Sequence, residues 1–260
     1  MRVFSLGRRP LWPFVLHYSP DSGTLAATAR AADYRRRDVW QWNFAGGTEW
    51  QSEQRYSYRD WDSTVLTFDG LVFGTKANLP TFRLPTKPGT SGERFRYCKA
   101  LVGPVYATLA RYNGVPTNTS RRGFLFAALV RDASNPRRRR TIEWVADSYL
   151  VGLLGLSADG GQMAAQVGYA LRVWDTTTGE QLGEVRARQQ QPKALAFSAD
   201  GRYLAVCYRD FVTFFDTANW TEVKAYSWNI GKLRCLAFSP DGTTAAVGSD
   251  KGKVVVFDLD

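Results

Sequence analysis

Runs of arginine are the residues of this chain best suited to bind a charged ligand. They occupy positions 8–9, 35–37, 121–122 and 137–140. Guanidinium groups form paired hydrogen bonds with phosphate and carboxylate oxygens, so converging runs would make an anion-binding surface. Arginine outnumbers lysine 26 to 8, and the formal net charge is +10. A genome with arginine-rich codons explains the same numbers without a ligand, and we favour that explanation.

We nevertheless retain the longer runs as candidate partner-binding residues, because each falls between segments with strand-like composition. The candidates are Arg35, Arg36, Arg37, Arg121, Arg122, Arg137, Arg138, Arg139 and Arg140. All of them are predicted to lie in loops, where long cationic side chains reach solvent.

Residues that catalyse reactions or bind metals are scarce. The chain has one histidine, His17, and three cysteines far apart in the sequence, Cys98, Cys207 and Cys235. Zinc needs clustered Cys or His ligands, and calcium loops need closely spaced carboxylates. A Gly-x-Ser-x-Gly elbow and a glycine-rich phosphate loop are both missing from the sequence. We therefore predict no enzymatic activity, no catalytic residue, no metal and no cofactor, and we expect His17 to be a packed or hydrogen-bonded core residue.

A repeat of about 41 residues organises the second half of the chain. Segments 153–160, 194–201 and 235–242 each end in Asp-Gly, with the aspartates 41 residues apart. A second landmark, Val-Trp-Asp or an equivalent with Phe-Asp, recurs at steps of 41 and 42 residues. Asp-Gly favours tight hairpin turns because glycine accepts a positive φ. This period with a Trp-Asp-like ending is typical of a four-stranded propeller blade.

These landmarks resemble the WD-repeat family of β-propellers over about residues 150–260. The landmark residues are Asp69, Gly70, Asp159, Gly160, Trp174, Asp175, Asp200, Gly201, Phe215, Asp216, Asp241, Gly242, Phe257 and Asp258. The family's Gly-His pair is absent, so the Asp–His–Ser–Trp hydrogen-bond network that the resemblance would imply cannot form here. The resemblance implies a single propeller domain over residues 1–260 that binds partners without catalysis.

The repeat extends weakly toward the N-terminus. Turn positions at 21, 69, 113, 159, 200 and 241 give six units, and 260 residues divided by six is about 43 per unit. We therefore predict an all-β propeller of four-stranded antiparallel blades, with six blades favoured over seven. Residues 2–6 are expected to supply the outer strand of the last blade and so close the ring, which removes an open sheet edge.

The third blade has two possible registers. In one, residues 123–130 form the second strand and 141–146 the third. In the other, which we prefer, those segments are the third and fourth strands, and 115–121 is a poor second strand. An Asn113-Gly114 turn precedes either arrangement.

Two functions compete, besides an enzyme built in the central channel, which would need converging ionisable groups. The first is a scaffold that binds a protein or peptide across one face of a monomeric propeller. The second is binding of nucleic acid or another anionic ligand through the arginine loops, with a steep salt dependence. Trp220 and Trp228 flank short loops and could add aromatic contacts to either. No signal peptide or membrane-spanning run occurs in the sequence, so we expect a cytoplasmic protein with reduced cysteines.

Overall fold

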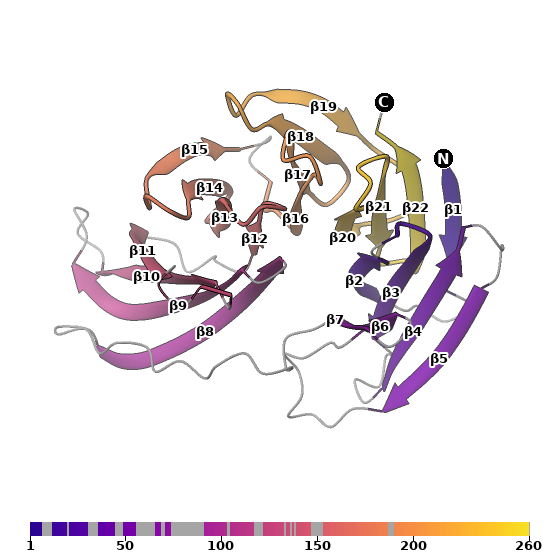
Figure 1. Cartoon of the computed structure of the whole chain (residues 1–260), viewed down its shortest axis with the longest axis horizontal. Helices are drawn as coiled ribbons and strands as arrows, with labels where there is room; N and C mark the ends of the chain where they lie inside the picture. The colour runs from indigo at the N-terminus through magenta and orange to yellow at the C-terminus, as the bar shows by residue number, and fades with distance from the viewer. Residues whose placement is uncertain are drawn as a thin grey trace. The chain divides into compact units, whose positions relative to one another are not determined.

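The structure is a computed structural model of the chain, and every regular element that it describes is a β-strand (Figure 1). The described residues are 1–6, 12–19, 21–30, 36–44, 49–55, 66–68, 71–73, 91–102, 105–116, 122–132, 134–135, 137, 139–146, 153–186 and 190–259. Among them, no helix has the length and apolar character needed to cross a membrane. The all-β prediction is therefore confirmed for this part of the chain.

Within the described residues, the strands form sheets in chain order, each from neighbouring segments. The first sheet contains β2 (Trp12–Tyr18), β3 (Thr24–Arg30), β4 (Arg36–Asn43) and β5 (Glu49–Arg55). The second is a hairpin of β6 (Leu66–Phe68) and β7 (Leu71–Phe73). The third contains β8 (Ser91–Val102), β9 (Val105–Pro116), β10 (Arg122–Asp132) and β11 (Arg139–Ala146).

The repeats recognised in the sequence form the remaining sheets. The fourth contains β12 (Leu154–Leu156), β13 (Gln162–Val167), β14 (Ala170–Asp175) and β15 (Gln181–Val185). The fifth contains β16 (Ala194–Phe197), β17 (Tyr203–Cys207), β18 (Val212–Asp216) and β19 (Glu222–Tyr226). The sixth contains β20 (Leu233–Phe238), β21 (Thr244–Ser249), β22 (Lys253–Asp258) and β1 (Arg2–Ser5).

The chain divides into two compact units. The first comprises Met1–Leu79, Lys193–Phe214 and Glu222–Asp260, and the second comprises Pro80–Pro192 and Phe215–Thr221. Each has its own apolar core. In the first unit, Phe214 lies edge-on to Tyr226, Phe238 and Phe257. In the second, Trp144 stacks on Trp174 with ring centroids 4.6 Å apart.

The N-terminal segment is the outer strand of the sixth sheet. β1 pairs antiparallel with β22, from Arg2 opposite Val256 to Ser5 opposite Lys253 (Figure 1). The backbone N–H of Leu6 also donates to the carbonyl of Gly252, at 2.7 Å. The predicted pairing between the two ends of the sequence is thus confirmed, and it covers an edge that would otherwise expose backbone hydrogen-bonding groups.

The third sheet corrects one prediction and supports another. β10 and β11 are its third and fourth strands, as the preferred register requires. The prediction of 115–121 as the second strand is wrong, because the second strand is β9, residues 105–116. Asn113 is not in a turn, since it pairs with Phe124 while Val115 pairs with Gly123. Gly114 is therefore the extra residue of a β-bulge, a second role for glycine within strands.

A repeated hydrogen-bond motif sets the turn between the first and second strands of four sheets. The serine hydroxyl donates to the aspartate Oδ1 two residues later, at 2.5–2.6 Å, and accepts from the backbone N–H five residues later, at 2.8–2.9 Å. The pairs are Ser19–Asp21, Ser157–Asp159, Ser198–Asp200 and Ser239–Asp241. The following residue has a positive φ, and it is glycine in three turns but Ser22 in the first. These local bonds form the turns in a chain that lacks the family's Gly-His pair.

Candidate interaction surface

The candidate arginines do not all lie in loops, as the sequence had suggested. Arg36 and Arg37 belong to β4, Arg122 to β10, and Arg139 and Arg140 to β11. Arg37 pairs in register with Arg30 on one side and Gln54 on the other. These arginines continue the strands because a side chain that points out of a pleated sheet can be charged at no cost to the ladder. The remaining loop residue of the set that the structure describes, Arg137, is exposed, whereas Arg35, Arg121 and Arg138 lie outside the described residues.

The arginines of the third sheet lie at opposite ends of that sheet. Arg122 begins β10, whereas Arg139 begins β11 and pairs with Arg131 near the end of β10. β10 is 11 residues long, and a strand rises about 3.3 Å per residue, so roughly 30 Å separates the two ends. These two runs therefore do not form one patch.

Arg140 is directed toward the fourth sheet. A Cβ atom at Gly179 would lie 3.2 Å from Cδ of Arg140, so the arginine stem packs on this glycine. The backbone N–H of Thr178 is the main cause that lowers the pKa of Asp175, and the nearby charge of Arg140 lowers it further. Arg140 thus stabilises a turn carboxylate inside the protein, although its exposure also leaves it accessible.

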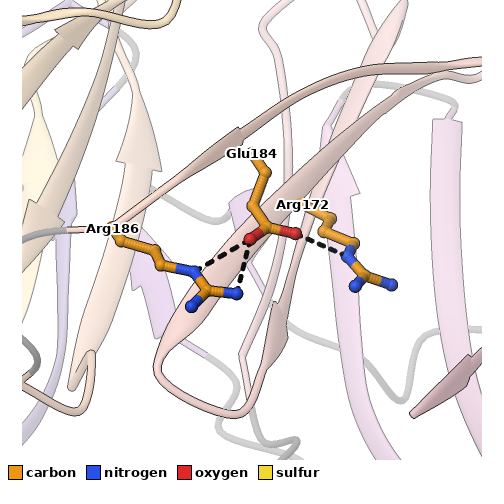
Figure 2. Close-up of polar contacts among 3 residues, drawn as sticks. All are labelled: Arg172, Glu184 and Arg186. Atoms are coloured by element: carbon orange, nitrogen blue, oxygen red, sulfur yellow. Dashed lines mark hydrogen bonds and ion pairs between the residues drawn. The ribbon is translucent and has the colours of Figure 1, made fainter.

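A second arginine cluster, absent from the sequence prediction, lies on the fourth sheet. Glu184 on β15 sits between Arg172 and Arg186 and accepts a hydrogen bond from the Nε of each, both at 2.8 Å (Figure 2). Partial burial raises the pKa of Glu184, but the two arginines outweigh this effect and the net shift is downward. Since the carboxylate already neutralises part of the charge, this cluster is a structural ion pair across neighbouring strands.

The other landmark residues have structural positions. Asp175 and Asp216 end β14 and β18, and their Oδ1 atoms accept backbone N–H groups in the turns that follow. Trp174 is buried, as is Phe257. Asp258 lies at the end of β22, 3.5 Å from the backbone amine of Met1. Asp69 and Gly70 lie outside the described residues, although β6 and β7 pair on either side of them.

His17 lies in β2 opposite Ala26, where the sequence placed it. It is half-buried, and desolvation lowers its pKa below the ordinary value of 6.5. Among the described residues, no group of three His, Cys, Asp or Glu side chains could hold a metal ion. The predictions that the chain has no enzymatic activity and no cofactor stay predictions.

Three loops of the first unit surround a hollow of about 540 Å³. They connect β17 to β18, β19 to β20, and β21 to β22. The hollow is lined by Asp210, Trp228, Asn229, Gly231, Lys232, Asp250 and Lys251. We call it the Trp228 hollow.

Backbone hydrogen bonds join these loops. The N–H of Lys232 donates to Oδ1 of Asp250 at 2.9 Å, and the N–H of Asp250 donates back to the carbonyl of Lys232 at 2.8 Å. The N–H of Leu233 donates to the carbonyl of Arg209 at 2.7 Å. Gly231 has a φ of 110°, and a Cβ there would lie 2.8 Å from Asp250 Oδ1. Glycine is therefore required at this position, and the loops are held in one conformation.

Trp228 forms the aromatic wall of the hollow. Its ring stacks on Tyr226 with centroids 5.9 Å apart and an interplanar angle of 17°, and it packs on Phe257 at 4.7 Å. The tryptophan is half-buried, so part of the ring meets solvent. A rigid, partly exposed tryptophan beside charged groups is the side-chain type that most often anchors protein partners.

Sequence reasoning singled out Trp228 but missed the other lining residues. A usable signal was present, because Tyr169, Asp210 and Lys251 are spaced by 41 residues. The repeat therefore places all three in the connection between the second and third strands of their own sheets. The contribution of Gly231 and Lys232 depends on contacts between loops, which no single repeat contains.

Comparison with known proteins agrees with the repeat found in the sequence. The model of the WD domain, G-beta repeat, matches residues 222–258, which run from β19 to β22. The predicted resemblance to WD-repeat proteins is thereby confirmed over this segment. Its ends include Trp228 and the two loops that contribute most of the hollow.

Three curated proteins are similar to parts of the chain. Telomerase protein component 1 of Mus musculus is 32% identical over 91 residues, which are 35% of this chain and 3% of that protein. Meiotic fizzy-related protein 2 of Schizosaccharomyces pombe is 25% identical over 113 residues, or 43% of this chain and 22% of that protein. Ribosome biogenesis protein ENP2 of Chaetomium thermophilum is 27% identical over 138 residues, or 48% and 21%. The matched region thus spans less than a quarter of each relative.

Proposed function

We propose that this chain is a non-catalytic interaction module that binds a protein or peptide partner at the Trp228 hollow. The observation that carries the proposal is the hollow itself: a half-buried tryptophan framed by loops that are hydrogen-bonded to one another. A preformed concave surface loses little conformational entropy on binding, so a modest contact area can be sufficient. The match to a WD repeat supports an interaction role in general terms.

We further propose that the sheets form a six-bladed ring in a monomeric, cytoplasmic protein. The support is that the described strands form six sheets in chain order, at about one repeat length each. The pairing of β1 with β22 supports closure, because it joins segments about 250 residues apart within a single sheet. A closed ring would give the loops of the Trp228 hollow a rigid base.

Binding of nucleic acid is the second candidate function. The exposed arginines Arg137 and Arg139 favour it, since they lie close together in the chain at one end of the third sheet. Such binding would weaken steeply with salt, because each phosphate contact releases counterions. A site anchored by tryptophan would depend much less on salt.

A capture experiment distinguishes these functions. The intact chain, a Trp228→Ala variant and an Arg137→Ser/Arg139→Ser variant are each used as bait in a lysate treated with nuclease. We expect a discrete protein to be retained by the intact chain and by the arginine variant at both low and high salt, and to be lost with Trp228→Ala. Retention of nuclease-sensitive nucleic acid that the arginine variant loses would support the second function instead.

A further inference from the structure

We propose that the Trp228 hollow binds an acidic peptide segment carrying an aromatic or large apolar side chain. This inference rests on the proposed function and specifies the chemistry of its partner. It is argued from the charges around the hollow, the state of its carboxylates and the rigidity of its aromatic wall.

The two carboxylates of the hollow already have cationic or N–H partners. Asp250 accepts the backbone N–H of Lys232 through Oδ1, and its Oδ2 lies 3.8 Å from Nη2 of Arg234. Oδ1 of Asp210 lies 3.7 Å from Nε of Arg209. A cationic ligand would have to compete with these groups, so the carboxylates do not favour one.

The lysines of the hollow are available to a ligand. Lys232 and Lys251 are both exposed, and neither ammonium group forms an ion pair with another residue that the structure describes. With Arg209 and Arg234, four cationic side chains surround two carboxylates. The surface therefore complements a negatively charged partner.

Trp228 supplies the apolar contact. One part of its ring is fixed by Tyr226 and Phe257, so the exposed part needs little ordering on binding. Offset or edge-to-face contact with a second aromatic ring adds to the energy of simple burial. An acidic segment with one aromatic residue thus satisfies both the charge and the apolar wall.

The loop geometry makes the arrangement of these groups specific. Lys232 follows Gly231, whose positive φ turns the chain against Asp250, and Lys251 follows Asp250 directly. The reciprocal hydrogen bonds between Lys232 and Asp250 hold the backbones of the two lysine-bearing loops together. The two ammonium groups therefore emerge beside each other from a fixed base, as a pair suited to successive carboxylates on one strand of peptide.

The test uses dye-labelled peptides and fluorescence anisotropy with the full chain. The acidic probe has one phenylalanine flanked by three glutamates on each side, and the matched probe replaces the glutamates with lysines. We expect the intact chain to bind the acidic probe at least about tenfold more tightly than the basic probe at low salt. Lys232→Gln/Lys251→Gln should weaken binding of the acidic probe about tenfold, since each exposed charge contributes a few-fold.

Matched variants separate charge and anchor from general effects. Arg202→Gln removes the same charge from an exposed residue that precedes β17, whereas the hollow lies beyond the end of that strand, so binding should not change. Trp228→Ala should reduce binding about tenfold or more, and Trp228→Phe, which retains a ring, should restore part of it. Urea unfolding of each variant establishes that it is folded.

The outcomes distinguish this inference from the proposed function. If a protein partner is captured through Trp228 while the two probes bind equally, the function holds and the acidic preference is wrong. The inference is also wrong if the lysine variant binds the acidic probe normally, or if labelled oligothymidine binds with the same dependence on Lys232, Lys251 and Trp228. Loss of partner capture by none of the variants would instead contradict the function.

Discussion

The backbone N–H of Asp241 donates a hydrogen bond to the hydroxyl of Ser22, at 3.1 Å, across 219 residues of sequence. The two residues occupy equivalent turns, one in the first sheet and one in the sixth. Ser22 has a φ of 61° at the position where the other turns have glycine. The serine therefore combines a backbone conformation that is unfavourable for a side chain with a contact that glycine could not make.

Substitutions at Ser22 should separate these two effects. Ser22→Ala removes the hydrogen bond and keeps the unfavourable φ, so we expect it to lower the free energy of unfolding by about 1 kcal/mol. Ser22→Gly removes the same bond but relieves the backbone, which is worth about 1 kcal/mol, so its stability should be close to that of the unchanged protein. Urea denaturation measures both. Equal destabilisation by alanine and glycine would contradict the backbone argument.

The Ser–Asp turns predict a pH dependence. The hydroxyl of Ser198 is the main cause that lowers the pKa of Asp200 below its ordinary value of 3.8. Because the folded-state pKa is lower, the interaction stabilises the protein above pH 3.8 and is lost as the pH falls through the folded-state pKa. Ser198→Ala should raise the pKa of Asp200 and flatten this part of the acid-unfolding curve. Carboxyl NMR titration of Asp200, with Asp241 as an internal control, tests the shift.

Local signals explain what could be predicted from the sequence. The turns at Asp159, Asp200 and Asp241 follow from turn chemistry within a few residues, and an even spacing places them in successive sheets. Asn113-Gly114 was misassigned because the same pair suits a hairpin turn and a bulge, and only the pairing of β9 with its neighbours decides between them. The Trp228 hollow could not be assembled from sequence, since its loops are joined by backbone hydrogen bonds between separate segments.

Gly231 should be the most sensitive glycine of the hollow. Alanine there would combine an unfavourable φ with a close contact to Asp250 Oδ1, so we expect a loss of about 2–3 kcal/mol in unfolding free energy. Gly201→Ala is the matched control, because φ is 73° but a Cβ would meet nothing within 4 Å. Its cost should be only about 1 kcal/mol. Similar losses for the two variants would mean that Asp250 does not fix the loop.

His17 predicts a second pH effect, in a higher range. Desolvation lowers its pKa below 6.5, so the unfolded chain binds a proton before the folded protein does. Stability should therefore fall as the pH decreases from about 7 to 5.5, before the carboxylates titrate. His17→Gln should remove this slope. Thermal unfolding at half-unit pH steps measures it, and a slope that persists in the variant would assign the effect to another group.

Arg140 and Arg139 should differ although they are neighbours in the sequence. Arg140 packs on Gly179 and helps lower the pKa of Asp175, whereas Arg139 pairs with Arg131 at the start of β11. We expect Arg140→Gln to raise the pKa of Asp175, and Arg139→Gln to leave it unchanged, in carboxyl NMR titrations. Raising the salt concentration should reduce the difference, because the charge acts through partly exposed space. If both variants shift Asp175 equally, the arginine run acts as a diffuse positive field, and the specific contact between β11 and the turn at 175–179 has no electrostatic role.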